Sequence, residues 1–189
     1  MQTHLYLVRH AHSDYTPDEK LRPLSPKGEK DARKVAEVLN KEGMDRVISS
    51  PYKRAIQTVE GISREINPEI LLWDGFRERL LSAGPVVDFQ AAVAKVWQQE
   101  NFAFEGGESN QQARARGVEE IKKVLQQYAG ERIAIGTHGN ILALILSHFD
   151  SRYGIEFWRQ LEMPDIYCLS FEGLELKKVR RIPLDVKVT

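Results

Sequence analysis

Short apolar runs of β-forming residues recur along the chain, and a helical pattern follows three of them. These runs lie at residues 5–8, 47–48 and 133–135. Apolar runs of this kind are typical of parallel strands that are buried on both faces. The repeated strand-then-helix order predicts a largely parallel sheet with helices on both faces. We therefore expect an α/β fold built as a three-layer α/β/α sandwich.

Helix signals support this pattern. Ser25 offers an N-cap and Pro26 a first helical residue, and apolar residues then recur at helical spacing until Gly43. Similar spacing predicts three further helices, over residues 55–66, from 109 or 110 to about 128, and over 141–149. Each of the three apolar runs is thus separated from the next by at least one helix.

The middle of the chain, residues 71–109, is the least regular part. It combines many aromatic residues with glycine and proline punctuation, so we expect a lid-like, helix-containing excursion from the sheet. Near the end of the chain, residues 166–171 and 174–179 flank Glu172 and Gly173, which predicts a terminal hairpin. A length of 189 residues matches one domain that spans residues 1–189.

The composition excludes several classes of protein. Lys plus Arg and Asp plus Glu both total 27, so no global field attracts nucleic acid or a membrane surface. A hydrophobic content of 42% beside 29% charged residues is typical of a globular domain rather than a disordered chain or a membrane protein. Cys168 is the single cysteine, which fits a cytoplasmic location. The oligomeric state is left open.

Basic and imidazole side chains follow the three apolar runs. Arg9 and His10 come directly after the first run. Arg54 lies just past the second, and His138 follows the third. Because ligands of open α/β sheets bind beyond the carboxyl ends of the strands, we expect these side chains to converge. Two guanidiniums and two imidazoles predict an anion site, and N–H groups of the helix that begins around Gly139 would face the same anion. A phosphoryl group is the expected ligand.

The segments around these positions resemble the motifs of the histidine phosphatase (phosphoglycerate mutase-like) superfamily. The similar segments are Arg9-His10-Ala11, Leu24-Ser25-Pro26-Lys27-Gly28, residues 49–58 around Arg54, Phe76-Arg77-Glu78-Arg79, Gly107-Glu108-Ser109 and Thr137-His138-Gly139. Their order and rough spacing resemble the family from residue 5 to about 145. Any one motif is unspecific, whereas the full ordered set is specific. The resemblance implies the phosphoglycerate mutase-like version of the α/β/α sandwich.

The resemblance also implies a phosphatase that acts through a phosphohistidine. His10 would attack phosphorus in line, and water would later hydrolyse the intermediate. The nearby guanidiniums would lower the pKa of His10 and keep its ring neutral. Arg9, Arg54 and His138 would hold the oxygens of the transferring group. Glu78 would give a proton to the leaving alcohol and take one from the attacking water.

Departures from the family motifs bear on the substrate. Ala11 replaces the family's glycine, and Thr16 stands where many mutases carry asparagine, before a loop that is shortened here. His12, Ser13 and Thr16 are candidates for contacts with the leaving group. Aromatic residues of the 71–109 segment are candidates for lining the mouth of the site, namely Phe76, Trp97, Phe102 and Phe104. We expect a small phosphomonoester as substrate, with no metal, no organic cofactor, and no nucleic acid or membrane as partner.

Three other functions fit parts of the pattern. His10, His12 and Asp14 match the first positions of the His-x-His-x-Asp-His zinc motif of metallo-β-lactamase-type hydrolases, but Tyr15 replaces the final histidine. A non-catalytic domain that binds a phosphorylated ligand would need neither a nucleophile nor an acid. A mutase would return the phosphoryl group to a bound acceptor, and the shortened loop after Thr16 favours hydrolysis instead.

Overall fold

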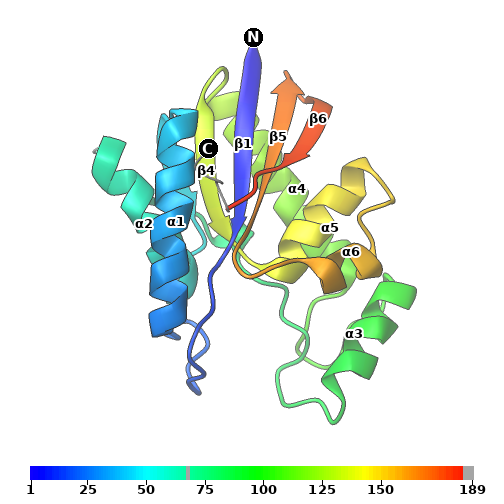
Figure 1. The fold of residues 1–189 in the computed structure, drawn as a ribbon. Coiled ribbons are helices and arrows are strands. Elements are labelled where there is room, and N and C mark those ends of the chain that lie inside the picture. Colours follow the sequence, from blue (N-terminus) through cyan, green and yellow to red (C-terminus); the bar gives the residue numbers. More distant parts are fainter. Residues whose placement is uncertain (67–68, 185–189) are drawn as a thin grey trace.

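The computed structural model describes residues 1–66 and 69–184 (Figure 1). The strands are β1 (Gln2–Arg9), β2 (Arg46–Ser49), β3 (Leu71–Leu72), β4 (Arg132–Thr137), β5 (Asp165–Glu172) and β6 (Glu175–Arg181). The α-helices are α1 (Pro26–Glu42), α2 (Lys53–Ile66), α3 (Phe89–Gln98), α4 (Asn110–Gln127), α5 (Gly139–Phe149) and α6 (Ile155–Gln160). A short 3₁₀ helix, η1 (Asp74–Phe76), lies between β3 and α3.

One sheet carries the described strands in the order β3-β2-β4-β1-β5-β6. β2 runs parallel to β3 and β4, and β1 runs parallel to β4. At the other end of the sheet, β5 is antiparallel to β1 and β6 is antiparallel to β5. The largely parallel sheet and the terminal hairpin that the sequence predicts are both confirmed.

Helices cover both faces of the sheet, which confirms the three-layer sandwich. α1 and α2 pack together on one face, and α4 and α5 cover the other (Figure 1). Alternate side chains of β1 enter two separate cores. Leu5 and Leu7 join the core under α4 and α5, whereas Tyr6 and Val8 join the core under α1 and α2. Burial on both faces explains why this run shows no alternation of polar and apolar residues.

The structure confirms where α1 begins and ends, and it fixes the start of α4. Ser25 Oγ accepts a hydrogen bond from the N–H of Gly28 at 3.1 Å, and the helix stops before Gly43, whose φ of 72° suits glycine. Ser109 and Gln112 form a reciprocal capping box, in which each side chain accepts from the other residue's N–H. Asn110 is therefore the first helical residue of α4.

Two short elements were not predicted from the sequence. β3 has two residues and α6 has six, so neither is long enough to show a hydrophobic period. Residues 71–109 leave the sheet after β3 and contain η1 and α3. In Figure 1, α3 lies apart from the sheet, on the side to which the carboxyl end of β1 points. The closure of this segment over the site as a lid stays a prediction.

The capping box of α4 generates a prediction about stability. We expect Ser109→Ala to lower the free energy of unfolding by about 1 kcal/mol, because an N–H at the start of the helix loses its acceptor. Urea denaturation measures this change, and the exposed Ser151 gives a matched control, with Ser151→Ala staying within about 0.5 kcal/mol of the original chain. Equal unfolding midpoints for the two variants would contradict the prediction.

Candidate active site

The pairing of β1 with β4 places two histidines side by side. Arg9 is opposite Thr137 in the parallel register, and the N–H of His10 donates to the carbonyl of Thr137 at 3.0 Å. His10 and His138 therefore leave their strands at the same level. Their ring centroids lie 5.2 Å apart in an edge-to-face arrangement. The convergence of these imidazoles that the sequence predicts is present in the structure.

His10 is held in one tautomer. Its Nδ1 lies 2.8 Å from the carbonyl oxygen of Ala11. Because a carbonyl can only accept, Nδ1 must carry the ring hydrogen. On the other side of the ring, Arg54 Nε donates to His10 Nε2 at 3.2 Å, so Nε2 presents its lone pair. This unprotonated nitrogen is the one that a nucleophilic imidazole requires.

The environment of His10 disfavours the imidazolium. Burial lowers the pKa of His10 to about 3, and the positive charge of Arg54 acts in the same direction. The contact with the Ala11 carbonyl opposes this fall, while Arg9 and Arg22 add to it. The neutral ring was expected from the arginines alone, but burial is the larger cause, because only 8% of His10 is exposed.

Arg54 is buried and Arg9 is partly buried beside this ring, and the backbone anchors both. Arg54 Nη1 donates to the carbonyl of Glu19 at 2.7 Å, and Arg9 Nη1 donates to the carbonyl of Leu161 at 2.8 Å. Arg9 Nε is buried and has no partner among the described residues. A Cβ on Gly139 would stand 3.0 Å from the Arg9 guanidinium carbon, so glycine at this position makes room for the arginine. Burial lowers the pKa of both arginines, but they stay charged because a guanidinium ordinarily loses its proton only far above neutral pH.

His138 is oriented by a serine from the neighbouring strand end. Its Nε2 lies 2.8 Å from Ser50 Oγ, and the N–H of Tyr52 also donates to that oxygen at 3.3 Å. A hydroxyl can both donate and accept, so Ser50 can give its own hydrogen to His138 Nε2, and in that arrangement the ring hydrogen lies on Nδ1. His138 Nδ1 is buried and has no partner among the described residues. Burial holds the pKa of His138 well below 6.5.

Glu78 binds the start of α5. Its Oε1 accepts from the N–H groups of Arg79 at 2.8 Å and Ile141 at 2.9 Å, and its Oε2 accepts from the N–H of Asn140 at 3.0 Å. We expected the N–H groups at this helix start to face the substrate anion. That expectation is wrong for Asn140 and Ile141, because the Glu78 carboxylate already occupies them.

The negative charge of Glu78 also interacts with Arg9 and Arg54, the two predicted phosphate-binding arginines. Burial is the main cause that lowers the pKa of Arg9 and of Arg54, and the nearby carboxylate of Glu78 opposes that fall in both. The acid candidate, the two cations and the two imidazoles are therefore close together. The sequence alone did not bring Glu78 near His10.

The candidates for substrate contact have mixed outcomes. Phe76 is fully buried in the core under α4 and α5, so its assignment to the mouth of the site is wrong. Trp97 packs against the same core from α3, and Phe102 and Phe104 pack edge to face with centroids 4.9 Å apart. None of these aromatic rings contacts the ring of His10 among the described residues.

The other three candidates for substrate contact, His12, Ser13 and Thr16, lie on the loop after His10. His12 is exposed, and its Nδ1 lies 2.8 Å from Ser25 Oγ. Ser13 pairs with Leu24 across the loop, and Thr16 Oγ1 donates to the carbonyl of Asp18 at 2.9 Å. Their role in substrate contact stays a prediction. Within the described ranges, no three His, Cys, Asp or Glu side chains form a group that could hold a metal ion.

Sequence reasoning missed four residues at the site. Ser50 lies in the motif at residues 49–58, but nothing in that motif predicted a contact with His138. Thr58 Oγ1 accepts from the N–H of Ala11 at 3.0 Å and donates to the carbonyl of Arg54 at 2.7 Å, which ties the loop after His10 to α2. Glu19 and Arg22 come from the loop after β1, where isolated charged residues carry no recognisable signal.

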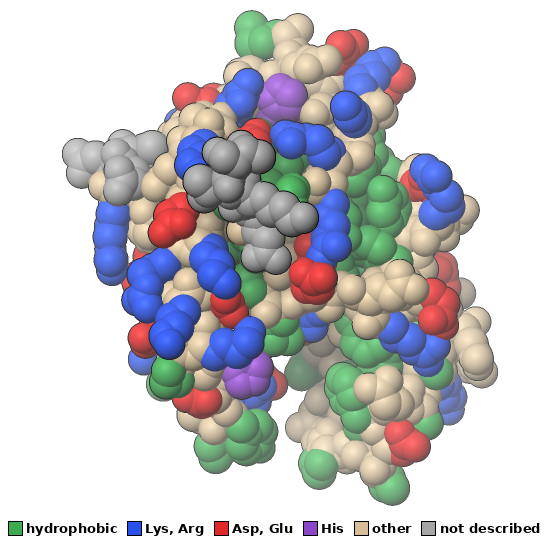
Figure 2. All heavy atoms as spheres, viewed as in Figure 1, with side chains coloured by type: hydrophobic (Ala, Val, Ile, Leu, Met, Phe, Trp, Pro, Cys, Tyr) green, Lys and Arg blue, Asp and Glu red, His purple; other side chains and the backbone are tan. Residues whose placement is uncertain are grey.

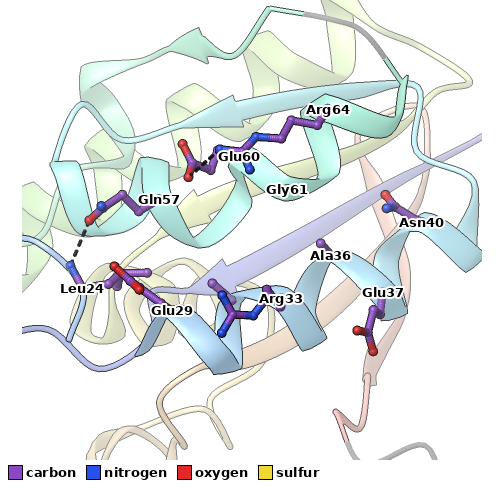
Figure 3. Close-up of a pocket in the computed structure, with 11 residues that line it drawn as sticks. Leu24, Glu29, Arg33, Ala36, Glu37, Asn40, Gln57, Glu60, Gly61 and Arg64 are labelled. Atoms are coloured by element: carbon purple, nitrogen blue, oxygen red, sulfur yellow. Dashed lines mark hydrogen bonds and ion pairs between the residues drawn. The ribbon is translucent and has the colours of Figure 1, made fainter. Parts of the chain in front are cut away.

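The surface is hollowed next to this region. Figure 2 shows a notch between the two lobes on the side to which the carboxyl end of β1 points. A second hollow, a polar groove of about 430 Å³ between α1 and α2, is separate from the candidate site (Figure 3). Charged side chains such as Glu29, Arg33 and Glu60 line that groove, and none of its lining residues belongs to the His10 cluster. Among the described helices, none is long and apolar enough to span a membrane.

Comparisons with known proteins agree with this geometry. The chain is 26% identical to the Bacillus subtilis protein named uncharacterized phosphatase PhoE, over 77% of this chain and 76% of that one. It is 28% identical to phosphoserine phosphatase 1 of Hydrogenobacter thermophilus, over 71% and 70% of the two chains. The solved structure of a mycobacterial glucosyl-3-phosphoglycerate phosphatase has the same fold, with a TM-score of 0.76, 19% identity, and coverage of 96% of this chain and 97% of that one.

The family assignment comes from a match over most of the sequence. The model of the histidine phosphatase superfamily (branch 1) matches residues 5–180. This match includes both strand-end histidines, Arg9, Arg54 and Glu78. It confirms the family and the phosphoglycerate mutase-like fold that the sequence motifs predicted. The chain belongs to the histidine phosphatase superfamily.

Proposed function

We propose that this chain hydrolyses phosphomonoesters through a phosphohistidine on His10. The state of the His10 ring carries the proposal. The Ala11 carbonyl occupies Nδ1, and the lone pair of Nε2 faces Arg54 at 3.2 Å. A neutral imidazole with one free nitrogen beside a guanidinium can attack the phosphorus of a phosphoryl group that the guanidinium binds. A domain that only binds phosphorylated ligands has no need for this tautomer.

The phosphoryl oxygens have donors around the attacking nitrogen. Arg9 Nε and His138 Nδ1 are buried and unpartnered among the described residues. The Arg9 N–H can donate to a ligand, and His138 Nδ1 can do so in the tautomer in which Ser50 donates to Nε2. An unsatisfied buried donor costs roughly 1–3 kcal/mol, which binding of an oxyanion recovers. Together with Arg54, these donors stabilise the equatorial oxygens of the transferring group. The guanidiniums fill the place that a metal ion takes in many other phosphoryl-transfer sites.

Glu78 is the proton donor of the proposed reaction. Its Oε2 accepts one N–H, from Asn140, and a second lone pair on that oxygen is left to carry a proton. In the first step this proton passes to the oxygen of the leaving alcohol. In the second step the carboxylate takes a proton from the water that attacks the phosphohistidine. Each step breaks one bond to phosphorus and forms one.

The substrate class follows from the site and from the relatives. Relatives and neighbours named for phosphoserine and glucosyl-3-phosphoglycerate support a small phosphomonoester as the substrate. We propose hydrolysis rather than mutase transfer, because the loop after Thr16 is short. Neither a nucleic acid nor a membrane is a proposed partner, and the cytoplasm remains the expected location. With Phe76 in the core, substrate selection falls to His12, Ser13, Thr16 and the rest of the 71–109 segment.

Trapping the intermediate tests the central proposal. A labelled phosphomonoester followed by a rapid quench in base should leave stoichiometric label on His10, because phosphohistidine survives base and not acid. His10→Ala should abolish labelling and turnover. His148→Ala, which removes an exposed histidine at the end of α5, should change neither. Label on a serine or aspartate, with activity kept in His10→Ala, would refute the assignment.

The role of Glu78 predicts a dependence on the leaving group. Glu78→Gln should lower kcat for an alkyl phosphate by about a hundredfold to ten-thousandfold, because an alkoxide leaves poorly without a proton. The loss should be much smaller for p-nitrophenyl phosphate, whose leaving group needs no proton. Glu119→Gln, on the exposed face of α4, is the control for charge. Equal losses on both substrates would exclude Glu78 as the acid.

The low pKa of His10 predicts the direction of a pH effect. In the folded state, nitrogen NMR should show Nε2 unprotonated from pH 7 down to about pH 4, since its pKa is about 3. The unfolded chain protonates the same ring near pH 6.5, so it binds more protons in this window. The free energy of unfolding should therefore fall less steeply with decreasing pH in His10→Gln than in the original chain. Protonation of folded His10 near pH 6.5 would contradict the burial argument.

A further inference from the structure

A carboxylate from the loop after β1 joins two guanidiniums at the site. Glu19 Oε2 lies 3.1 Å from Arg54 Nη2, and Glu19 Oε1 lies 3.1 Å from Arg22 Nη2. The Glu19 side chain is 58% exposed, whereas Arg54 and Arg22 are 6% and 17% exposed. An exposed anion thus reaches inward to two largely buried cations, with one oxygen on each.

Glu19 uses the hydrogen-bond donors of Arg54 that a substrate needs. Arg54 Nε donates to His10, Nη1 donates to the Glu19 carbonyl, and Nη2 meets the Glu19 carboxylate. Each nitrogen of this guanidinium is therefore engaged by the protein itself. A phosphoryl oxygen that binds Arg54 next to His10 must share or replace one of these contacts. The carboxylate is the group that can leave most easily, because it is the exposed one.

Arg22 faces the same place and has spare donor capacity. Its Nε is buried with no partner among the described residues. Its guanidinium lies over the ring of Tyr15, 4.9 Å from the centroid, and its Nη2 is 3.4 Å from the carbonyl of Thr16. The positive charge of Arg22 is close enough to add to the fall in the pKa of His10 and of Arg54, which burial mainly causes. The positive charge of Arg22 therefore acts on His10 and is not fully screened by solvent.

We propose that Arg22 is a further residue that binds the phosphoryl oxyanion of the substrate. In the free protein, the Glu19 carboxylate occupies the position of that oxyanion. The inference rests on the proposed function for its substrate class. A carboxylate presents two oxygens and one negative charge, whereas a phosphate monoester presents three oxygens and nearly two charges. Two guanidiniums bind the more highly charged group better. Substrate binding therefore displaces the Glu19 side chain, and Arg22 and Arg54 then pair with the phosphoryl group instead.

Binding of inorganic phosphate tests this proposal without turnover. Calorimetry on the full chain should show that Glu19→Gln binds phosphate about fivefold tighter, because the competing charge is gone. Arg22→Gln should bind phosphate about tenfold more weakly, because one charge-assisted donor is lost. The charge-matched controls are Glu37→Gln and Arg33→Gln on α1, in the separate groove of Figure 3, and both should bind like the original chain.

The double variant separates competition from a general change of charge. In Glu19→Gln/Arg22→Gln, the gain from removing Glu19 should be smaller than in the chain that keeps Arg22, because only the contact of Glu19 with Arg54 is then left to release. Circular dichroism and a thermal unfolding curve check that each variant is folded, and Arg22→Lys, which keeps the charge, should recover part of the affinity. Phosphate affinities of Glu19→Gln and Arg22→Gln equal to those of their controls would overturn the proposal.

The same experiments distinguish failure of this inference from failure of the proposed function. If the expected affinity changes appear while His10 takes no label from a phosphomonoester, the anion-binding role of Arg22 stands and the hydrolase proposal falls. If His10 is labelled but the affinities follow the controls, the hydrolase proposal stands and the role of Arg22 falls. Neither result depends on identifying the physiological substrate.

Discussion

The parallel pairing of β1 with β4 is the constraint on which the site depends. It aligns Arg9 with Thr137, so the next residue of each strand is a histidine that leaves the sheet at the same edge. β2 lies on the other side of β4 with Ser49 opposite Gly136, which brings Ser50 within 2.8 Å of His138. A shift of this register by one residue would turn the strand side chains to the opposite face and separate the two imidazoles.

Burial of positive charge explains the electrostatics of the site. One nitrogen of Arg9 and one of Arg54 donate to carbonyl oxygens, which hold the guanidiniums in place without neutralising them, although Arg54 also pairs with the exposed Glu19 carboxylate. Their fields add to the desolvation of His10, so the imidazole stays neutral while the surroundings stay positive. These two conditions usually conflict, because a nucleophile near an anion tends to be protonated. Here the fixed guanidiniums supply the positive charge that the proposed phosphate binding needs, and the histidine keeps its lone pair.

The free N–H groups at the start of α5 could bind either a substrate anion or a carboxylate of the protein. N–H groups at the beginning of a helix attract anions, and the sequence pointed to the substrate as that anion. In the structure, the N–H groups of Asn140 and Ile141 donate to the Glu78 carboxylate instead. This contact anchors a residue of an irregular segment next to two strand ends. The acid candidate is therefore positioned by the same helix that follows His138.

Most of the fold could be predicted from the sequence because each long helix and every described strand except β3 carries a local signal. Two buried faces require apolar runs, and Ser25, Gly43 and Ser109 mark helix ends through hydrogen bonds within a few residues. β3 and α6 were missed because they are too short to repeat a pattern. Phe76 was misplaced because an aromatic residue in an irregular segment gives no indication of which way its side chain points.

The order of residues along the chain is enough to show that Arg9, His10, Arg54 and His138 follow strands, and it also shows the order of the family motifs. How these groups are oriented toward one another depends on the folded structure. The tautomer of His10 depends on the direction of the Ala11 carbonyl, and the place of Glu78 depends on the path of its segment to α5. The approach of Glu19 and Arg22 depends on how the loop after β1 folds back. Contacts of this kind join residues whose spacing in the chain carries no periodic signal, so they appear only when the chain is folded.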